Sequence, residues 1–168
     1  TSELIADATG EFRVHSVNLN NLQENTEYEY RVGDGMNWSA TETFKTASKV
    51  KEDFTFTLVA DSQAYDEKGF QLYADVINQA KKRNPNTEFL LHAGDIVEEG
   101  NRLDQWDMFL NYQAQTNLPI MTVMGNHDVY GQGTQTYNTL IQNPKNGPEE
   151  FKNSVYYQDY GDARFIIL

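Results

Sequence analysis

Alternating polar and apolar positions dominate the first 48 residues and predict short antiparallel strands. Over residues 26–32, apolar and Thr side chains alternate with charged ones, which is typical of a half-buried strand. Weaker alternation predicts further strands over 12–19 and 39–46, with turn residues between them. Three strands are too few for a two-sheet sandwich, so residues 1–48 are expected to be only part of an all-β domain.

The pattern changes at residue 54, where apolar runs alternate with helical spacing. The predicted strands cover 54–60, 88–93 and 119–124, and the predicted helices cover 67–83 and 102–116. Strands that are apolar on both faces, in the order β–α–β–α–β, indicate an α/β domain with a sheet covered by helices.

The remainder of the chain predicts a loop and a hairpin. Residues 129–152 are polar and rich in Gly, Asn, Gln and Pro, so a long loop is expected there. Residues 154–158 and 164–168 flank a turn sequence at 159–162, which predicts a β-hairpin.

The charge and composition of the chain limit the classes of partner that it can bind. The 168 residues contain 25 acidic and 13 basic side chains, and the formal net charge is −12. This charge disfavours nucleic-acid partners, which require a Lys/Arg excess. It permits a small phosphorylated substrate if a metal ion supplies positive charge. The absence of Cys excludes disulfides and thiolate metal sites, and no apolar run is long enough for membrane insertion.

Polar side chains that can bind metal follow each of the three apolar strands. The candidates are Asp61 and Gln63 after the first strand, Asp95 after the second, and Asn126, His127 and Asp128 after the third. In such sheets ligands bind at the carboxyl ends of the strands. Carboxylate, amide and imidazole groups together suit Mg, Mn, Fe or Zn. Taken singly, each residue could instead be a helix cap or a turn residue.

These segments resemble the calcineurin-like metallophosphoesterase family, whose pattern is Asp-x-His, Gly-Asp, Gly-Asn-His-Asp/Glu, a lone His and Gly-His-x-His. The chain has Asp61-Ser-Gln63, Gly94-Asp95 and Gly125-Asn-His-Asp128. Residues 22–46 resemble the end of the fibronectin-like sandwich that precedes the catalytic domain of purple acid phosphatases. The resemblance implies the first half of a four-layer α/β/β/α domain over 49–168, after the last strands of a sandwich over 1–48.

The resemblance also implies roles for the candidate residues. Asp61 would bind one metal ion, Asn126 would bind a second, and Asp95 would bridge the two ions. The metal ions would be Fe, Mn or Zn. His127 would face the substrate and protonate the leaving group, and Asp128 would orient His127. The implied reaction is hydrolysis of a phosphomonoester or phosphodiester, by an acidic protein located outside the cell or at its surface.

Two departures from the family pattern bear on activity. Gln63 stands where most members have His, and Glu98 stands where purple acid phosphatases have a metal-binding Tyr, so no tyrosinate-to-iron colour is expected. Glu98, Glu99 or Tyr65 could compensate, and the sequence does not select among them. The chain ends without the lone His and the Gly-His-x-His segment. It is therefore expected to be a fragment of a longer protein and inactive by itself.

Four further interpretations concern the function of the chain and the roles of single residues. A degenerate phosphoesterase fold that binds without catalysis is the main alternative, and a nuclease of the same superfamily is disfavoured by the net charge. His92 is interpreted as a hydrogen-bonded strand histidine rather than a metal ligand. Ser62 and Ser154 have no nearby His/Asp arrangement in the sequence that would support nucleophilic catalysis.

Overall fold

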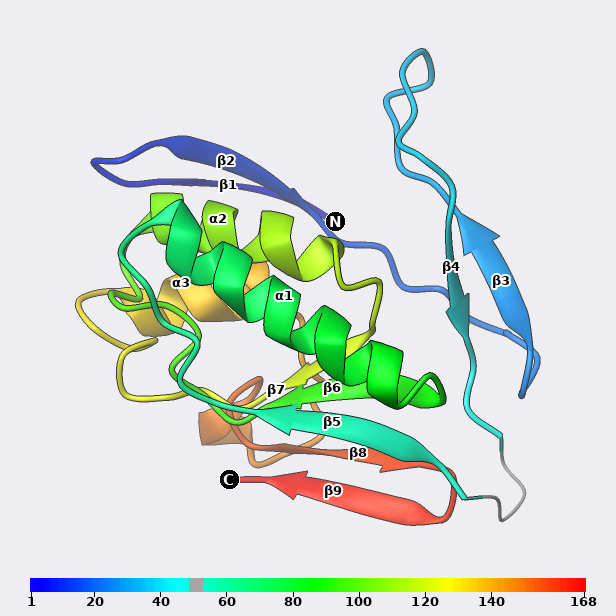
Figure 1. Cartoon of the computed structure of the whole chain (residues 1–168). Helices are drawn as coiled ribbons and strands as arrows, with labels where there is room; N and C mark the ends of the chain where they lie inside the picture. The colour runs from blue at the N-terminus through cyan, green and yellow to red at the C-terminus, as the bar shows by residue number, and fades with distance from the viewer. Residues whose placement is uncertain (49–52) are drawn as a thin grey trace.

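The computed structural model describes residues 1–48 and 53–168 of the chain (Figure 1). The domain boundary expected between residues 48 and 49 adjoins residues 49–52, which lie outside the described residues, so the boundary stays a prediction. Within the described residues, no helix combines the length and the apolar character that crossing a membrane requires.

The N-terminal part consists of two antiparallel strand pairs. β1 (Ser2–Ala6) pairs with β2 (Glu11–His15), and β3 (Glu27–Tyr30) pairs with β4 (Glu42–Lys45). The three predicted strands are present, each shorter than expected. The structure contains one strand that was not predicted, β1. Its sequence alternates too weakly to predict a strand, and it is extended because it pairs with β2. The β1–β2 pair lies over helix α2, whereas β3 and β4 stand apart from the remainder (Figure 1).

A parallel three-stranded sheet forms the centre of the second part. β5 (Thr55–Val59), β6 (Thr87–His92) and β7 (Ile120–Thr122) lie side by side in the order β5-β6-β7. Helices α1 (Glu67–Arg83) and α2 (Leu103–Ala114) connect them, which confirms the β–α–β–α–β prediction. Because all three strands run in one direction, their carboxyl ends meet at one edge of the sheet.

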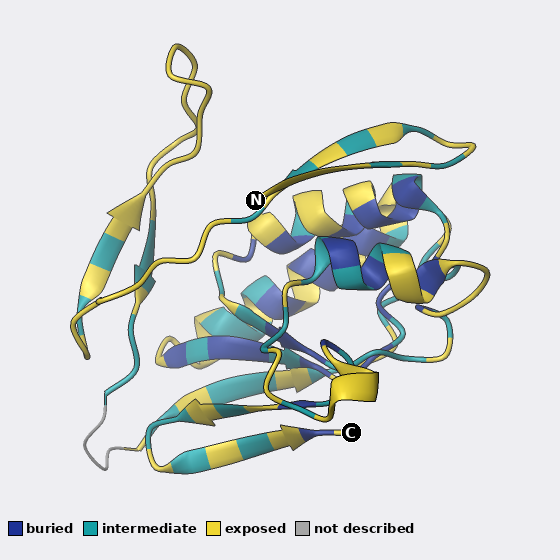
Figure 2. Cartoon of the chain, turned by 180° about the vertical axis from the view of Figure 1, so that it is seen from behind, coloured by how far each residue is buried: buried dark blue, intermediate teal, exposed yellow. Residues whose placement is uncertain are grey.

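Two hydrophobic clusters pack on the two faces of this sheet. On one face the buried Phe70 and Trp106 of the helices pack with Leu90. On the other face Phe89 packs with Tyr156 of the C-terminal hairpin, and burial of one such large side chain contributes about 1.5–3 kcal/mol. The buried residues accordingly line the inner helix faces and the sheet (Figure 2). The sequence of layers, helices then parallel sheet then antiparallel pair, agrees with the α/β/β/α architecture.

The C-terminal hairpin is confirmed, with a tighter turn than expected. β8 (Tyr156–Tyr160) pairs with β9 (Ala163–Ile167) through a two-residue connection in which Gly161 has a φ of 57°. Asp159 was expected in the turn but lies in β8 opposite Arg164, and their side chains form an ion pair at 2.6 Å. This cross-strand pair keeps Asp159 within the strand.

The long loop predicted over 129–152 is wrong in part. Helix α3 (Gly133–Leu140) and a short 3-10 turn, η1 (Glu149–Phe151), lie within it. Helix α3 is rich in Thr and Asn, which are poor helix formers, so its propensity gives no signal. Tertiary contacts hold it instead: the fully buried Tyr137 ring packs at 5.9 Å from Trp106, and its hydroxyl lies 2.6 Å from that of Thr122.

Helix α2 is capped by the N-terminal strand pair. Arg102, at its N-cap position, makes no side-chain cap bond. The Asp7 carboxylate accepts a hydrogen bond from the Leu103 N–H at 2.7 Å, and the Thr9 hydroxyl accepts one from Asp104 at 3.2 Å. The turn between β1 and β2 thus satisfies two N–H groups that the helix cannot pair internally.

Candidate active site

The three loops that carry the predicted site residues meet at the carboxyl edge of the parallel sheet. Asp61 follows β5, Asp95 follows β6 and Asn126 follows β7. Asp61 and Asp95 have positive φ values of 57° and 54°. Few residues other than Gly adopt this conformation, and it clusters at functional sites.

Main-chain contacts fix the first two loops against each other. The Asp61 N–H donates to the Gly94 carbonyl at 3.1 Å, and the Gln63 N–H donates to the Asp95 carbonyl, also at 3.1 Å. The loop after β5 therefore continues the pairing of β5 with β6 beyond the strands. Asp61, Gln63 and Asp95 are held close together by backbone bonds that do not depend on their side chains.

The third loop approaches the second so closely that Gly is required. A Cβ on Gly125 would collide with the main-chain nitrogen and the carboxylate of Asp95. The Asp95 carboxylate also accepts a hydrogen bond from the His127 N–H at 2.9 Å. Asn126 lies between Gly125 and His127 in the sequence, so these two contacts bring it to the same edge as Asp95.

Asp128 joins these loops through their N–H groups. It is fully buried, and its Oδ1 accepts hydrogen bonds from Ile96 at 2.8 Å and Val97 at 3.1 Å. Its Oδ2 accepts one from Gly125 at 2.8 Å. Burial raises the pKa of Asp128, and these three bonds act in the opposite direction. The carboxylate thus joins the two loops through three N–H groups, and the implied role of orienting the His127 ring stays a prediction.

Glu98 is the residue that contacts the His127 ring. The Nδ1 atom of His127 lies 2.9 Å from the Glu98 main-chain oxygen and 3.5 Å from its carboxylate. A carbonyl only accepts, so Nδ1 carries a proton and Nε2 is left for another partner. The bond to the Glu98 carbonyl, followed by the carboxylate charge, raises the pKa of His127. The Tyr65 hydroxyl donates to the Glu98 carboxylate at 2.9 Å, so one residue considered as a compensating group, Glu98, lies beside the imidazole and a second, Tyr65, contacts Glu98.

The donor atoms fit a metal ion of oxygen preference, although they form an incomplete set. The Gln63 Oε1 atom is buried without a hydrogen-bond partner, which leaves its lone pairs for a cation. Asp61 and Asn126 are exposed and Asp95 is half-buried, so their oxygens are accessible. Carboxylate and amide oxygens suit Mg or Mn. Among the described residues, no three His, Asp or Glu side chains are grouped closely enough to hold a metal ion.

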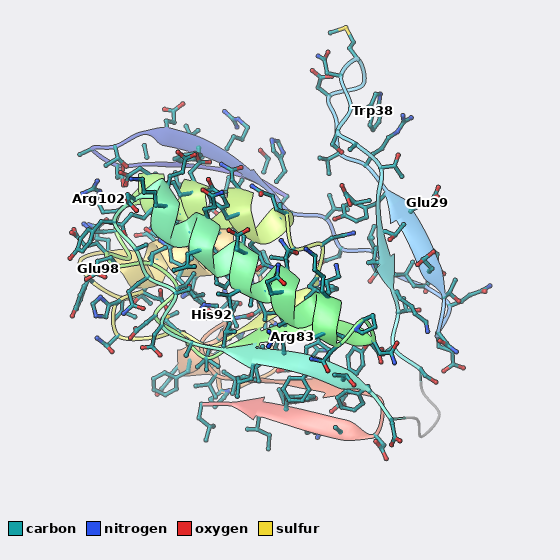
Figure 3. The ribbon with its side chains drawn as sticks, viewed as in Figure 1. Glu29, Trp38, Arg83, His92, Glu98 and Arg102 are labelled. Atoms are coloured by element: carbon teal, nitrogen blue, oxygen red, sulfur yellow. The ribbon has the colours of Figure 1, made fainter. Side chains whose placement is uncertain are left out.

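Two residues behind the site, His92 and Ser62, form a contact that was not predicted from the sequence. His92 is fully buried in β6, between helix α1 and the sheet (Figure 3), and its Nε2 lies 2.8 Å from the Ser62 hydroxyl. The hydrogen-bonded strand histidine that we expected is therefore present, and Ser62 does have a His beside it. The signal was the register of the sheet: Val59 pairs with His92, and Ser62 lies three residues after Val59.

Profiles of two known families match the chain. Residues 54–168 match the family described as Calcineurin-like phosphoesterase, and residues 1–46 match the one described as Purple acid Phosphatase, N-terminal domain. The structure of the purple acid phosphatase PPD1 from yellow lupin (Lupinus luteus) seeds superposes with a TM-score of 0.63 at 20% identity, over 88% of this chain and 31% of that one. This likeness shows the shared fold.

Two curated proteins are similar in sequence. "Probable inactive purple acid phosphatase 1" of Arabidopsis thaliana is 26% identical over 181 residues, which covers 92% of the chain and 30% of that protein. "Probable cyclic nucleotide phosphodiesterase" of Moraxella catarrhalis (strain BBH18) is 38% identical over 60 residues, or 36% of the chain and 21% of that protein. The matched residues thus span less than a third of the length of either relative.

Proposed function

The chain belongs to the calcineurin-like phosphoesterase family, and we propose that the full-length protein hydrolyses small phosphate esters at the edge where the three loops meet. The observation that carries this proposal is the bonding of the loops after β5, β6 and β7 to one another through Gly94, Asp95 and Gly125. This bonding supports the assignment of four potential oxygen ligands, Asp61, Gln63, Asp95 and Asn126, to one edge of the sheet. The family generally uses a dinuclear metal centre for hydrolysis.

We assign Asp61, Gln63, Asp95 and Asn126 to metal binding. When bound, two metal ions would neutralise the phosphoryl oxygens and acidify the attacking water. All four residues offer oxygen, and the buried Gln63 Oε1 has no other partner. Of the three metals that the resemblance implies, oxygen donors favour Mn over Fe and Zn.

His127 is assigned to the leaving group. Its Nδ1 proton is held by the Glu98 carbonyl, so Nε2 is the atom that can exchange a proton with substrate. The raised pKa keeps the imidazolium form available as a proton donor. Glu98, fixed by the Tyr65 hydroxyl, positions the ring without itself contacting substrate.

The test uses the full-length protein, stripped of metal and then titrated with Mn²⁺. Binding is followed by calorimetry and hydrolysis with an aryl phosphate. Hydrolysis should require the metal and should be lost in Asp95→Asn, whereas Asp107→Asn, an exposed position on α2, should retain it. Absence of both metal binding and hydrolysis with Mn, Fe and Zn would contradict the proposal.

A binding module without catalysis is the second candidate. Two observations favour it: Gln63 is a weaker ligand than the imidazole of the family pattern, and the Arabidopsis relative is named as inactive. In that case the protein would bind Mn²⁺ and inorganic phosphate in calorimetry, while the aryl phosphate remains intact. Turnover that depends on Asp95 would exclude this candidate.

We further propose that the protein functions outside the cell or at its surface. Purple acid phosphatases are often secreted or extracellular, and the N-terminal 46 residues match a domain of that group. Fractionation of the source cells, followed by detection of the protein in the medium, wall or cytosol, tests this location. Recovery in the cytosol alone would contradict it.

A further inference from the structure

We propose that a hydrogen-bond chain, from His92 through Ser62 to Asp128, aligns the three loops that carry the assigned metal ligands. Ser62 and His92 would then be positioning residues of this site. The expected consequence of this alignment is a higher metal affinity, and that consequence rests on the proposed function. The chain of bonds itself rests on contacts among described residues.

The first step is the protonation state of His92. Its side chain is fully buried, and burial lowers the pKa of His92 to about 4, so the ring is neutral at pH 7 and carries one N–H. The Nδ1 atom is buried and has no partner, whereas Nε2 lies 2.8 Å from the Ser62 hydroxyl oxygen. A buried N–H without an acceptor is rarer and more costly than an unpaired lone pair. The proton is therefore on Nε2, and His92 donates to Ser62.

The second step is the direction of the Ser62 hydroxyl. A hydroxyl has one hydrogen and two lone pairs, and one lone pair already accepts from His92. The hydrogen is free to go to the main-chain oxygen of Ile96, 3.2 Å away. Hydrogen bonds arranged in series polarise and strengthen one another, so this arrangement favours both contacts.

The third step crosses the peptide unit between residues 96 and 97. Its carbonyl accepts from Ser62, and its N–H, that of Val97, donates to Asp128 Oδ1 at 3.1 Å. Asp128 Oδ2 in turn accepts from the Gly125 N–H at 2.8 Å. The chain of bonds thus begins in β6, passes through the loop after β5, returns to the loop after β6 and ends in the loop after β7.

Three links of the bond chain lie next to an assigned ligand in the sequence. Ser62 is between Asp61 and Gln63, Ile96 follows Asp95, and Gly125 precedes Asn126. A shift at any link therefore moves a ligand by a similar amount. Metal affinity is sensitive to such supporting contacts, and their removal typically weakens binding by about 10- to 100-fold.

A nucleophilic role for Ser62 does not fit the same contacts. The His92 ring lies 5.9 Å from Tyr73 and 6.0 Å from Phe109, ring centre to ring centre, and its Nδ1 has no carboxylate partner to orient it. With its hydrogen directed at a carbonyl, Ser62 also has no base positioned to activate it.

The experiment compares three variants of the full-length protein. Ser62→Ala removes the central hydroxyl, Ser62→Thr retains it, and Ser154→Ala removes the hydroxyl of another half-buried serine, outside the bond chain. Two quantities are measured: amide hydrogen exchange of the peptide covering 93–98 in metal-free protein, and the Kd for Mn²⁺ by calorimetry.

The inference expects Ser62→Ala to exchange about five- to tenfold faster at residues 96 and 97 and to bind Mn²⁺ about tenfold more weakly. Ser62→Thr and Ser154→Ala should resemble the unmodified protein in both measurements. Unchanged exchange in Ser62→Ala, or equal acceleration in the Thr and Ala variants, would overturn the bond chain. Failure of the unmodified protein to bind Mn²⁺ would overturn the proposed function instead, and the exchange data would still decide on the alignment.

Discussion

Replacement of Asp128 by Asn should lower the stability of the protein, because its carboxylate holds two loops of the site together. In the structure, Oδ1 accepts from Ile96 and Val97, and Oδ2 accepts from Gly125. An Asn side chain can keep the oxygen on the side of Ile96 and Val97. Its amide nitrogen would then face the Gly125 N–H, so that this buried donor loses its acceptor.

The magnitude follows from two opposing effects. A hydrogen bond to a charged acceptor contributes about 1.5–3 kcal/mol, and a buried N–H left unpaired costs about 1–3 kcal/mol. The raised pKa of Asp128 shows that burial of its charge offsets part of this gain, a cost that Asn removes. We expect a net loss of about 2 kcal/mol for Asp128→Asn and about 4 kcal/mol for Asp128→Ala, which leaves three donors unpaired. At about 2–4 °C per kcal/mol, the Asn variant should lose about 4–8 °C in Tm.

Thermal unfolding of the full-length protein by calorimetry measures this loss, with Asp107→Asn as the control. Asp107 is exposed on α2, and exchange of such a residue should change stability by less than about 0.5 kcal/mol. An Asp128→Asn variant with the Tm of the unmodified protein would refute the reasoning. If that variant also lost activity, the implied role of Asp128 in orienting His127 would be the better account.

The remaining predictions concern His92, Tyr137 and Asp7. Burial lowers the pKa of His92 from 6.5 to about 4, so protonation opposes folding. Stability should be unaffected above about pH 7 and should fall by about 3 kcal/mol as the pH decreases from 6.5 to 4. This part of the decrease should be absent from urea midpoints of His92→Gln. Tyr137→Phe removes the hydroxyl that lies 2.6 Å from the buried Thr122 hydroxyl and should cost about 1–2 kcal/mol in the same urea titration at pH 7; an unchanged midpoint would contradict the contact. Asp7→Ala removes the acceptor of the Leu103 N–H and should cost about 1 kcal/mol, visible as faster amide exchange in the first turn of α2 and not in α1.

The sequence was sufficient for the parts of the fold that depend on local patterns. Apolar runs of strand length and helical spacing located the parallel sheet and its helices, because these elements bury whole faces. The direction of the strands then placed Asp61, Asp95 and Asn126 at one edge without any knowledge of distances. The structure brings these three residues to that edge, and their metal binding stays a prediction.

Features that depend on contacts across the chain could not be predicted. Helix α3 contains mostly residues of low helix propensity, and it forms because Tyr137 packs against Trp106 and contacts Thr122. Ser62 and His92 are 30 residues apart, and only the register of β5 on β6 brings them within 2.8 Å. The resemblance implies that Asp128 orients His127, whereas its Oδ1 accepts hydrogen bonds from Ile96 and Val97 in the loop after β6. In each case the decisive partner is distant in the chain, where no motif records it.

The charge of the site links its structure to the choice between the two proposed functions. Asp61, Asp95 and Asp128 follow the three strands in a chain of net charge −12, and the guanidinium of Arg102 is already paired with Asp104 at 2.7 Å. A phosphate ester is itself an anion, so these carboxylates oppose its binding unless positive charge is supplied. The net charge that disfavours a nucleic-acid partner is thus compatible with a small phosphate ester only in a site that holds metal. Metal binding therefore has to be measured before hydrolysis. If the protein holds no metal, a lack of hydrolysis does not test the roles of the site residues.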